Sequence, residues 1–149
     1  MPETWAHRAD LAESAITERH AQKLWMLPKT NMAVVAWPPG LKDKLFWHWH
    51  YWWQAQYLDC QVDAAMRRPT KTRRRRILQT MRTIQGRSRG RLTRNIYYDD
   101  KAWLALAWAR AGQLPKNNGK VSSKRSKVLE DLEFDLLSGI DPVVGVLPW

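Results

Sequence analysis

Two adjacent aspartates, Asp99 and Asp100, follow two tyrosines and precede an apolar run that is typical of a helix. A pair of carboxylates is what hydrolysis of a glycosidic bond requires, because one attacks or stabilises the sugar and the other donates and accepts a proton. The same residues also suit the start of a helix, where a carboxylate accepts hydrogen bonds from free backbone N–H groups and opposes the helix dipole. Catalysis and helix capping are therefore both open for this stretch.

Tryptophan is unusually frequent, with 10 among 149 residues. Large aromatic side chains are common at binding surfaces as well as in cores. Several of them cluster in residues 49–56, whose sequence is WHYWWQAQ. Gln54 and Gln56 lie within this cluster, and a buried amide needs a hydrogen-bond partner. That partner is either a substrate hydroxyl at a cleft or the neighbouring backbone, and the sequence leaves both open.

The formal net charge of +11 is unevenly distributed, because every charged residue between Asp63 and Asp99 is Arg or Lys. The block Arg67–Arg94 could bind nucleic acid or another polyanion. It could equally be the solvated face of a helix, with arginine stems lying along apolar surface. Helical periodicity in the block favours the solvated face. A small basic helical protein that binds a polyanion is the alternative function.

A single cysteine, Cys60, excludes an intrachain disulfide. It lies in an aromatic and apolar run, so we expect a small core residue. His48 and His50 are two residues apart, whereas a metal-binding pair on a helix is typically at i and i+4. We therefore expect no metal and no cofactor. The first residues lack a signal-peptide core and no stretch has the length of a membrane span, so the sequence as written predicts a cytoplasmic location without membrane contact.

Apolar residues recur at helical spacing in five segments. We expect helices over about residues 3–27, from 49 to a stop at Pro69, from 70 or 72 to 85, from 99 or 100 to 113, and from 123 to 138. Residues 33–37 are apolar but too few to imply a sheet. Short connections predict that neighbouring helices are antiparallel. The sequence therefore predicts an all-α fold made of helical hairpins.

Two of these helices carry informative faces. In the second, one face repeats apolar and aromatic residues at i, i+4, i+8, i+11 and i+15: Trp49, Trp53, Tyr57, Cys60 and Ala64. The helix that follows the aspartates is apolar on more than one side, which is typical of a helix buried between others. It is therefore expected at the centre of the fold.

Two stretches resemble glycoside hydrolase family 76, the endo-α-1,6-mannanases. WHYWWQAQ at residues 49–56, followed by Leu58-Asp59, resembles an N-terminal signature of that family. YYDDKAWLAL at residues 97–106 resembles its catalytic segment. Residues 139–149 resemble its later Gly-rich loop ending in Pro-Trp, and Trp37-Pro38-Pro39 also fits the pattern. These matches occur in order along nearly the whole chain.

The resemblance implies an (α/α)6 barrel, an α/α toroid that cleaves α-1,6-mannosidic linkages with retention. By the family's pattern, Asp99 is the nucleophile and Asp100 is the general acid/base. Neighbouring positions at a helix start can hold two carboxyl groups about 5–5.5 Å apart, the separation of a retaining enzyme. Trp52, Trp53 and Tyr98 would stack on sugar faces, unless they are core residues.

About five helices form only the first half of such a barrel, so residues 1–149 are expected to be a single incomplete α/α-toroid domain. The expected function is that of a truncated mannanase-like hydrolase, whose catalytic competence the sequence leaves open. Its partner would be α-mannan or a related oligosaccharide, and relatives of this kind are often secreted. Half a toroid exposes apolar helix faces, which monomers rarely tolerate over large areas, so self-association through an open face is a further expectation.

Overall fold

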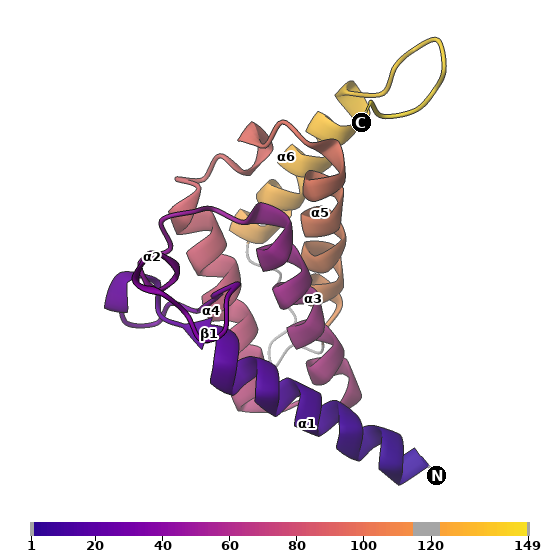
Figure 1. Ribbon diagram of the computed structural model, residues 1–149. Coiled ribbons are helices and arrows are strands. Elements are labelled where there is room, and N and C mark those ends of the chain that lie inside the picture. Colours follow the sequence, from indigo (N-terminus) through magenta and orange to yellow (C-terminus); the bar gives the residue numbers. More distant parts are fainter. Residues whose placement is uncertain (1, 115–122, 149) are drawn as a thin grey trace.

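The chain is largely helical in a computed structural model that describes residues 2–114 and 123–148 (Figure 1). Its elements in order are α1 (Pro2–His20), β1 (Ala21–Gln22), η1 (Leu24–Met26), β2 (Met32–Ala33), α2 (Leu41–Lys44), α3 (Tyr51–Arg67), α4 (Lys71–Arg87), η2 (Leu92–Arg94), α5 (Tyr98–Gln113) and α6 (Ser123–Ser138). The predicted all-α class is confirmed. Residues 115–122, between the last two expected helices, and Trp149 of the Pro-Trp end lie outside the described residues.

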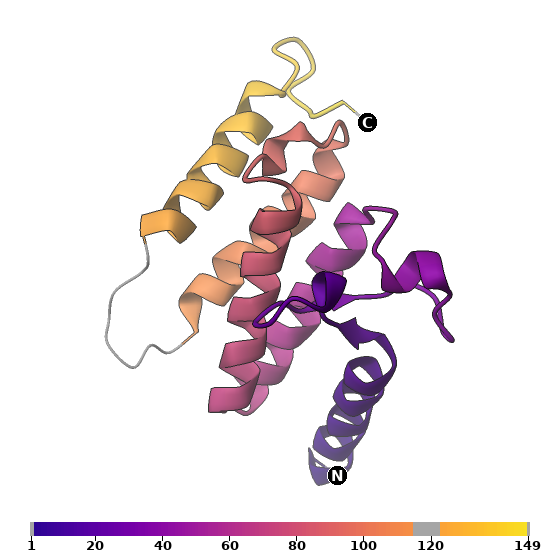
Figure 2. The same cartoon turned by 90° about the vertical axis from the view of Figure 1, so that its left-hand side faces the viewer.

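Helices α3 to α6 run alternately down and up, so each is antiparallel to the next in the chain (Figures 1 and 2). Helix α3 packs against both α4 and α5, and α6 packs against α5. The starts of α3 and α5 and the ends of α4 and α6 consequently lie at one end of the bundle (Figure 1). We call this end the mouth.

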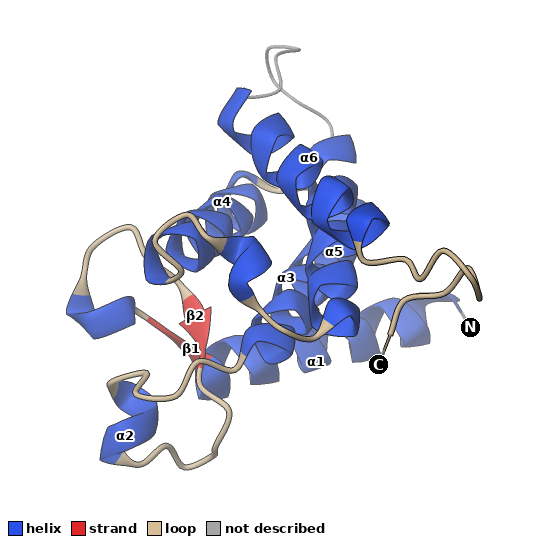
Figure 3. Cartoon of the chain, turned by 90° about the horizontal axis from the view of Figure 1, so that it is seen from above, coloured by secondary structure: helices blue, strands red, loops and turns tan. Residues whose placement is uncertain are grey.

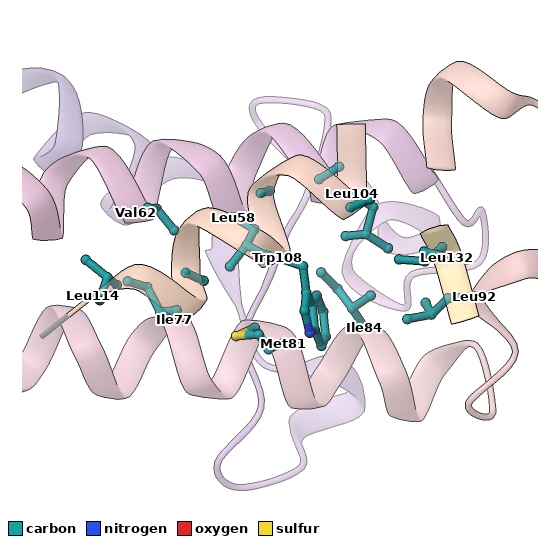
Figure 4. Close-up of a cluster of buried hydrophobic side chains, with 14 of the residues drawn as sticks. Leu58, Val62, Ile77, Met81, Ile84, Leu92, Leu104, Trp108, Leu114 and Leu132 are labelled. Carbon is teal, nitrogen blue, oxygen red and sulfur yellow. The ribbon is translucent and has the colours of Figure 1, made fainter. Parts of the chain in front are cut away.

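The core is built around the indole of Trp108 on α5, which is 2% exposed. Figure 4 shows it between Leu58 of α3 and Met81 and Ile84 of α4. Leu58 is fully buried, and the small residues Ala55 and Ala65 on the same face of α3 let the helices approach closely. One large ring thus joins the three central helices.

The buried face of α3 differs from the face that the spacing of its aromatic residues predicts. The side chains in the main core are Tyr51, Ala55, Leu58, Val62 and Ala65. Cys60, expected in the core, is exposed and lines a hollow of about 320 Å³ beneath α1. The expectation was wrong because α3 turns its aliphatic side, and not its tryptophan-bearing side, towards α5.

Helix α1 ends at His20, seven residues before the predicted Leu27. Its last carbonyl accepts from Val34 N at 2.8 Å, and the chain then pairs β1 with β2 in an antiparallel register, Ala21 opposite Ala33. These two-residue strands form a small sheet beside the bundle (Figure 3). Backbone pairing that is distant in sequence therefore overrides the helical periodicity of residues 21–27.

Two other helix boundaries also differ from the sequence-based expectation. Helix α4 continues through Gly86, predicted to follow its last turn, and the reversal occurs instead at Gly90, whose φ is +73°. Residues 41–44, between the first and second expected helices, form α2, whose start is held by Asp43 Oδ2 accepting from Gly40 N at 2.9 Å. Among the described residues, none of the helices is long and apolar enough to span a bilayer.

Ion pairs attach α1 to the bundle, because its described side chains are exposed or half-buried and none lies in the core. Figure 2 shows α1 beside the other helices. Arg73 on α4 is 8% exposed and contacts Glu13 and Asp10. Arg67 donates to Asp10 at 2.7 Å. The hydrogen bond from Arg67 lowers the pKa of Asp10, and that from Arg73 lowers the pKa of Glu13. Part of the basic block is thus neutralised inside the fold.

Replacing Leu58 with alanine tests the position of the core. Leu58 is fully buried, whereas Leu106 on α5 is 57% exposed. We expect Leu58→Ala to lower the free energy of unfolding by about 2–5 kcal/mol, and Leu106→Ala to lower it far less. Chemical denaturation followed by circular dichroism measures both. Equal losses would mean that the core lies elsewhere.

The attachment of α1 should depend on pH. Asp10 and Glu13 have lowered pKa values in the folded chain, so their stabilisation is complete above their ordinary values of 3.8 and 4.5 and is lost as pH falls through the lowered ones. We expect Arg73→Gln to lower the thermal unfolding midpoint at pH 7, and this difference from wild type to become smaller as pH falls through the lowered pKa values of Asp10 and Glu13. Arg82→Gln, at an exposed position of the same helix, is the control. A difference that stays constant while the carboxyl groups of Asp10 and Glu13 become protonated would exclude the ion pairs as its cause.

Candidate active site

The mouth of the bundle holds a groove of about 500 Å³. It is formed where α3 and α5 begin and α4 ends, because the antiparallel arrangement brings these three termini together (Figure 1). Its lining includes Trp49, Trp52, Arg87, Arg91, Arg94 and Asp100. We call it the mouth groove. A carboxylate, indole rings and guanidinium groups thus meet in one concave surface.

Asp100 is the carboxylate of the mouth groove, and it lies in the first turn of α5. Asn95 Nδ2 donates a hydrogen bond to Asp100 Oδ2 at 2.6 Å. Asn95 is itself held by its Oδ1, which accepts from Tyr97 N at 3.0 Å. One carboxyl oxygen is therefore fixed by a tight turn before the helix, and the other remains for a ligand.

Neither Asp99 nor Asp100 is the N-cap residue of α5, although the sequence leaves helix capping open for both. Tyr97 occupies the N-cap position of α5, and no side chain makes the capping hydrogen bond there. Asp99 and Asp100 follow within the first turn, where their charge still opposes the helix dipole. Asp99 is exposed and does not line the mouth groove. The structure brings Asp100 into the groove and leaves Asp99 beside it.

Trp52, predicted to contact substrate, lines the mouth groove and is 44% exposed. Trp53 is equally exposed, but it lies outside the lining, with its ring centroid 4.6 Å from that of Trp52. Trp49 and Tyr97 add further aromatic surface within the groove. Flat apolar rings beside polar groups offer a stacking surface for a sugar or another flat ligand.

Gln54, also predicted to contact substrate, is 2% exposed and does not line the groove. Its Nε2 donates to Ala33 O at 2.7 Å, and its Oε1 accepts from Ala33 N at 3.0 Å. The amide thus anchors β2 to α3, which is the backbone-bonded alternative that the sequence left open. Gln56 is half-buried and also lies outside the groove lining.

Tyr98 is half-buried at the junction of α5 and the end of α6, away from the groove lining. Lys101 Nζ lies 3.8 Å from the centroid of its ring and also pairs with Asp135 on α6. A Cβ atom added to Gly139 would lie 2.3 Å from Tyr98 Cε1. In this structure the tyrosine therefore contacts the glycine loop that the family resemblance singles out, and it does not face the groove.

Sequence reasoning missed several groove residues. Tyr51 is buried, its hydroxyl donates to Leu92 O at 3.0 Å, and burial, reinforced by the charges of Asp100 and Asp135, raises its pKa. Arg91 and Arg94 were treated as part of one basic block, although they precede the aspartates by only a few residues. Their position in a turn directly before the aspartates was the available signal. Within the described residues, no group of three or more His, Cys, Asp or Glu side chains could hold a metal ion.

No protein-family model matches the chain, and neither a curated protein nor a solved structure shows significant similarity to it. The function must therefore be inferred from the geometry of the chain's own residues and from the sequence motifs.

The contact between Gly139 and Tyr98 can be tested by a double-mutant cycle. Gly139→Ala forces the ring away from Gly139 and Lys101, so we expect a loss of about 1 kcal/mol in the free energy of unfolding. In a Tyr98→Ala background the same substitution should cost nothing.

Gly112→Ala is the matched control, because a Cβ there has no atom within 4 Å. Helix propensity predicts that it stabilises the chain by about 0.5–1 kcal/mol. Additive effects of the changes at positions 98 and 139 in denaturant unfolding would show that the two residues do not interact.

Proposed function

We propose that this chain is a glycoside hydrolase resembling the retaining endo-α-1,6-mannanases. The observation that supports the proposal is the meeting of Asp100 with the indoles of Trp49 and Trp52 in the mouth groove. A sugar ring stacks its apolar face on an aromatic ring, and cleavage needs a carboxyl group beside the glycosidic oxygen. The groove supplies both within one surface of the fold.

Asp100 takes the role of general acid/base. Its Oδ2 is held by Asn95 Nδ2, which fixes the orientation of the carboxyl group and leaves Oδ1 for the glycosidic oxygen. A proton donor must lie within hydrogen-bond reach of the atom it protonates, and a carboxyl group held on a rigid helix start meets that requirement. Asn95 is therefore a positioning residue in this proposal.

Asp99 takes the role of nucleophile on the strength of the family resemblance. Its side chain is exposed beside the groove, so substrate binding has to draw the carboxylate towards the anomeric carbon. Side-chain rotation at neighbouring positions of a first turn suffices for a separation of about 5–5.5 Å between the two carboxyl groups. The assignment makes both aspartates essential for retention.

The proposed fold context is roughly the first half of an α/α toroid, with residues 1–149 as one incomplete domain. Helices α3 to α6 form successive antiparallel hairpins, the unit from which such a toroid is built (Figure 2). On α5 the second apolar side remains open, with Trp103 50% and Leu106 57% exposed. Further helices, or a second copy of the chain, would cover this side.

The alternative proposal is a basic protein that binds nucleic acid or another polyanion through Arg67–Arg94. Its support is the net charge of +11. Arg67, Arg68 and Arg73 contact the carboxylates of Asp10 or Glu13, so this part of the block is already neutralised. The structure therefore favours the groove-based hydrolase over the polyanion surface.

Release of reducing ends from α-1,6-mannan tests the hydrolase. We expect Asp99→Asn and Asp100→Asn each to lower the rate by at least about 100-fold, because each removes a group that acts in the transition state. Glu130→Gln, at an exposed position of α6, is the control and should retain the rate. Hydrolysis that survives either aspartate substitution would contradict the assigned role, and a wild-type chain that neither binds nor cleaves the polymer would contradict the function.

A further inference from the structure

The mouth groove contains three guanidinium groups that the fold does not neutralise. Arg87, Arg91 and Arg94 line it, and none makes an ion pair with a carboxylate in the described part of the chain. Several arginines outside the groove do form ion pairs. Arg67, Arg68 and Arg73 pair with carboxylates of α1, and Arg110 pairs with Asp59 and Asp63. The mouth groove thus brings together three guanidinium groups that form no ion pair with a carboxylate of the described residues.

Arg87 is held in place by aromatic rings. Its guanidinium carbon lies 5.7 Å from the ring centroid of Trp25 and 5.7 Å from that of Trp49. Trp25 is in turn fixed by its indole Nε1, which donates to Leu45 O at 2.7 Å. Cation–π contacts with two rings orient the planar group before any ligand arrives. Its Nε is buried without a hydrogen-bond partner, so the side chain retains donor capacity.

Arg91 and Arg94 extend this charge along the segment that connects α4 to α5. Both are exposed and both line the groove, and Asp100, the carboxylate that shares it, is bonded to Asn95. A cation in the last turn of a helix also complements the helix dipole, and this could account for Arg87. It does not account for Arg91 and Arg94, which lie beyond the end of α4.

We propose that the mouth groove recognises a glycan bearing an anionic group, with the sugar on Trp49 and Trp52 and the anion on Arg87, Arg91 and Arg94. A guanidinium presents a fork of N–H donors that matches phosphate or carboxylate oxygens, and it binds them more specifically than a lysine does. The inference rests on the proposed function, because it takes the same groove and adds a charged substituent to its sugar ligand. The preferred substrate is therefore a mannan that carries an anionic group, bound more tightly than the neutral polymer.

Isothermal titration calorimetry with three ligands tests this inference. The ligands are α-1,6-mannotriose, the same trisaccharide carrying one phosphate monoester, and inorganic phosphate alone. We expect the phosphorylated trisaccharide to bind wild type at least about tenfold more tightly than the neutral one, since a single charge-assisted hydrogen bond has an effect of that size. Inorganic phosphate should bind more weakly than the phosphorylated sugar, because it lacks the stacking surface.

The variant that tests the assignment is Arg91→Gln combined with Arg94→Gln. Both side chains are exposed, so the fold should persist, and circular dichroism checks it. The ratio of the two trisaccharide affinities should fall below the wild-type value of at least about ten, with Arg87 left to contact the anion. Arg82→Gln, which removes an exposed charge from α4 outside the groove lining, should leave the ratio unchanged. Raising the salt concentration should reduce the ratio for wild type, because the added affinity is electrostatic.

The outcomes separate this inference from the proposed function. Equal binding of the neutral and phosphorylated trisaccharides would overturn the anionic substrate while leaving the hydrolase proposal standing. If inorganic phosphate binds and neither trisaccharide does, the groove is an anion site that does not recognise a glycan, and both this inference and the hydrolase proposal are wrong. A preference for phosphate that is undiminished in the Arg91→Gln, Arg94→Gln variant at low salt would show that these two arginines do not hold the anion and would overturn the inference.

Discussion

The packing of α3 against α4 and α5 around Trp108 is the constraint on which the rest of the structure depends. The ring fills the space between Leu58, Met81 and Ile84 (Figure 4), and these contacts fix the three helices in antiparallel order. That order brings the starts of α3 and α5 to the end of α4 and so creates the mouth groove. The chemistry assigned to Asp100 therefore depends on aliphatic and aromatic packing deeper in the bundle.

The sequence predicted the helices well where a single periodic face is buried. Residues 123–138 form α6 as expected, and α5 begins beside the aspartates. Prediction failed where distant residues decide the outcome. Helix α1 stops at His20 because its last carbonyl and the following strand pair with residues 32–34, a contact that no local pattern reveals. On α3 the aromatic residues suggested one buried face, whereas the core is formed by a different face that carries mainly small and aliphatic side chains.

The candidate site was predicted in part, for a related physical reason. Asp100 and Trp52 lie in the mouth groove because they occupy the first turns of two helices that start side by side. Gln54 is only two residues after Trp52, but the helix turns its amide inwards to Ala33. The arginines that line the groove were hidden within a longer basic run, since the sequence cannot show which charges the fold neutralises. Exposure and ion pairing separate them only once the helices are assembled.

We propose that a sugar binds at the mouth of the bundle, against Trp52 and Asp100. Nuclear magnetic resonance of the ¹⁵N-labelled chain, titrated with α-1,6-mannotriose, tests it most directly. We expect the largest shifts at the indole N–H groups of Trp49 and Trp52 and at the backbone amides of residues 95–100. Shifts confined to the hollow between α1 and α3, with the signals of the mouth unchanged at saturation, would contradict it.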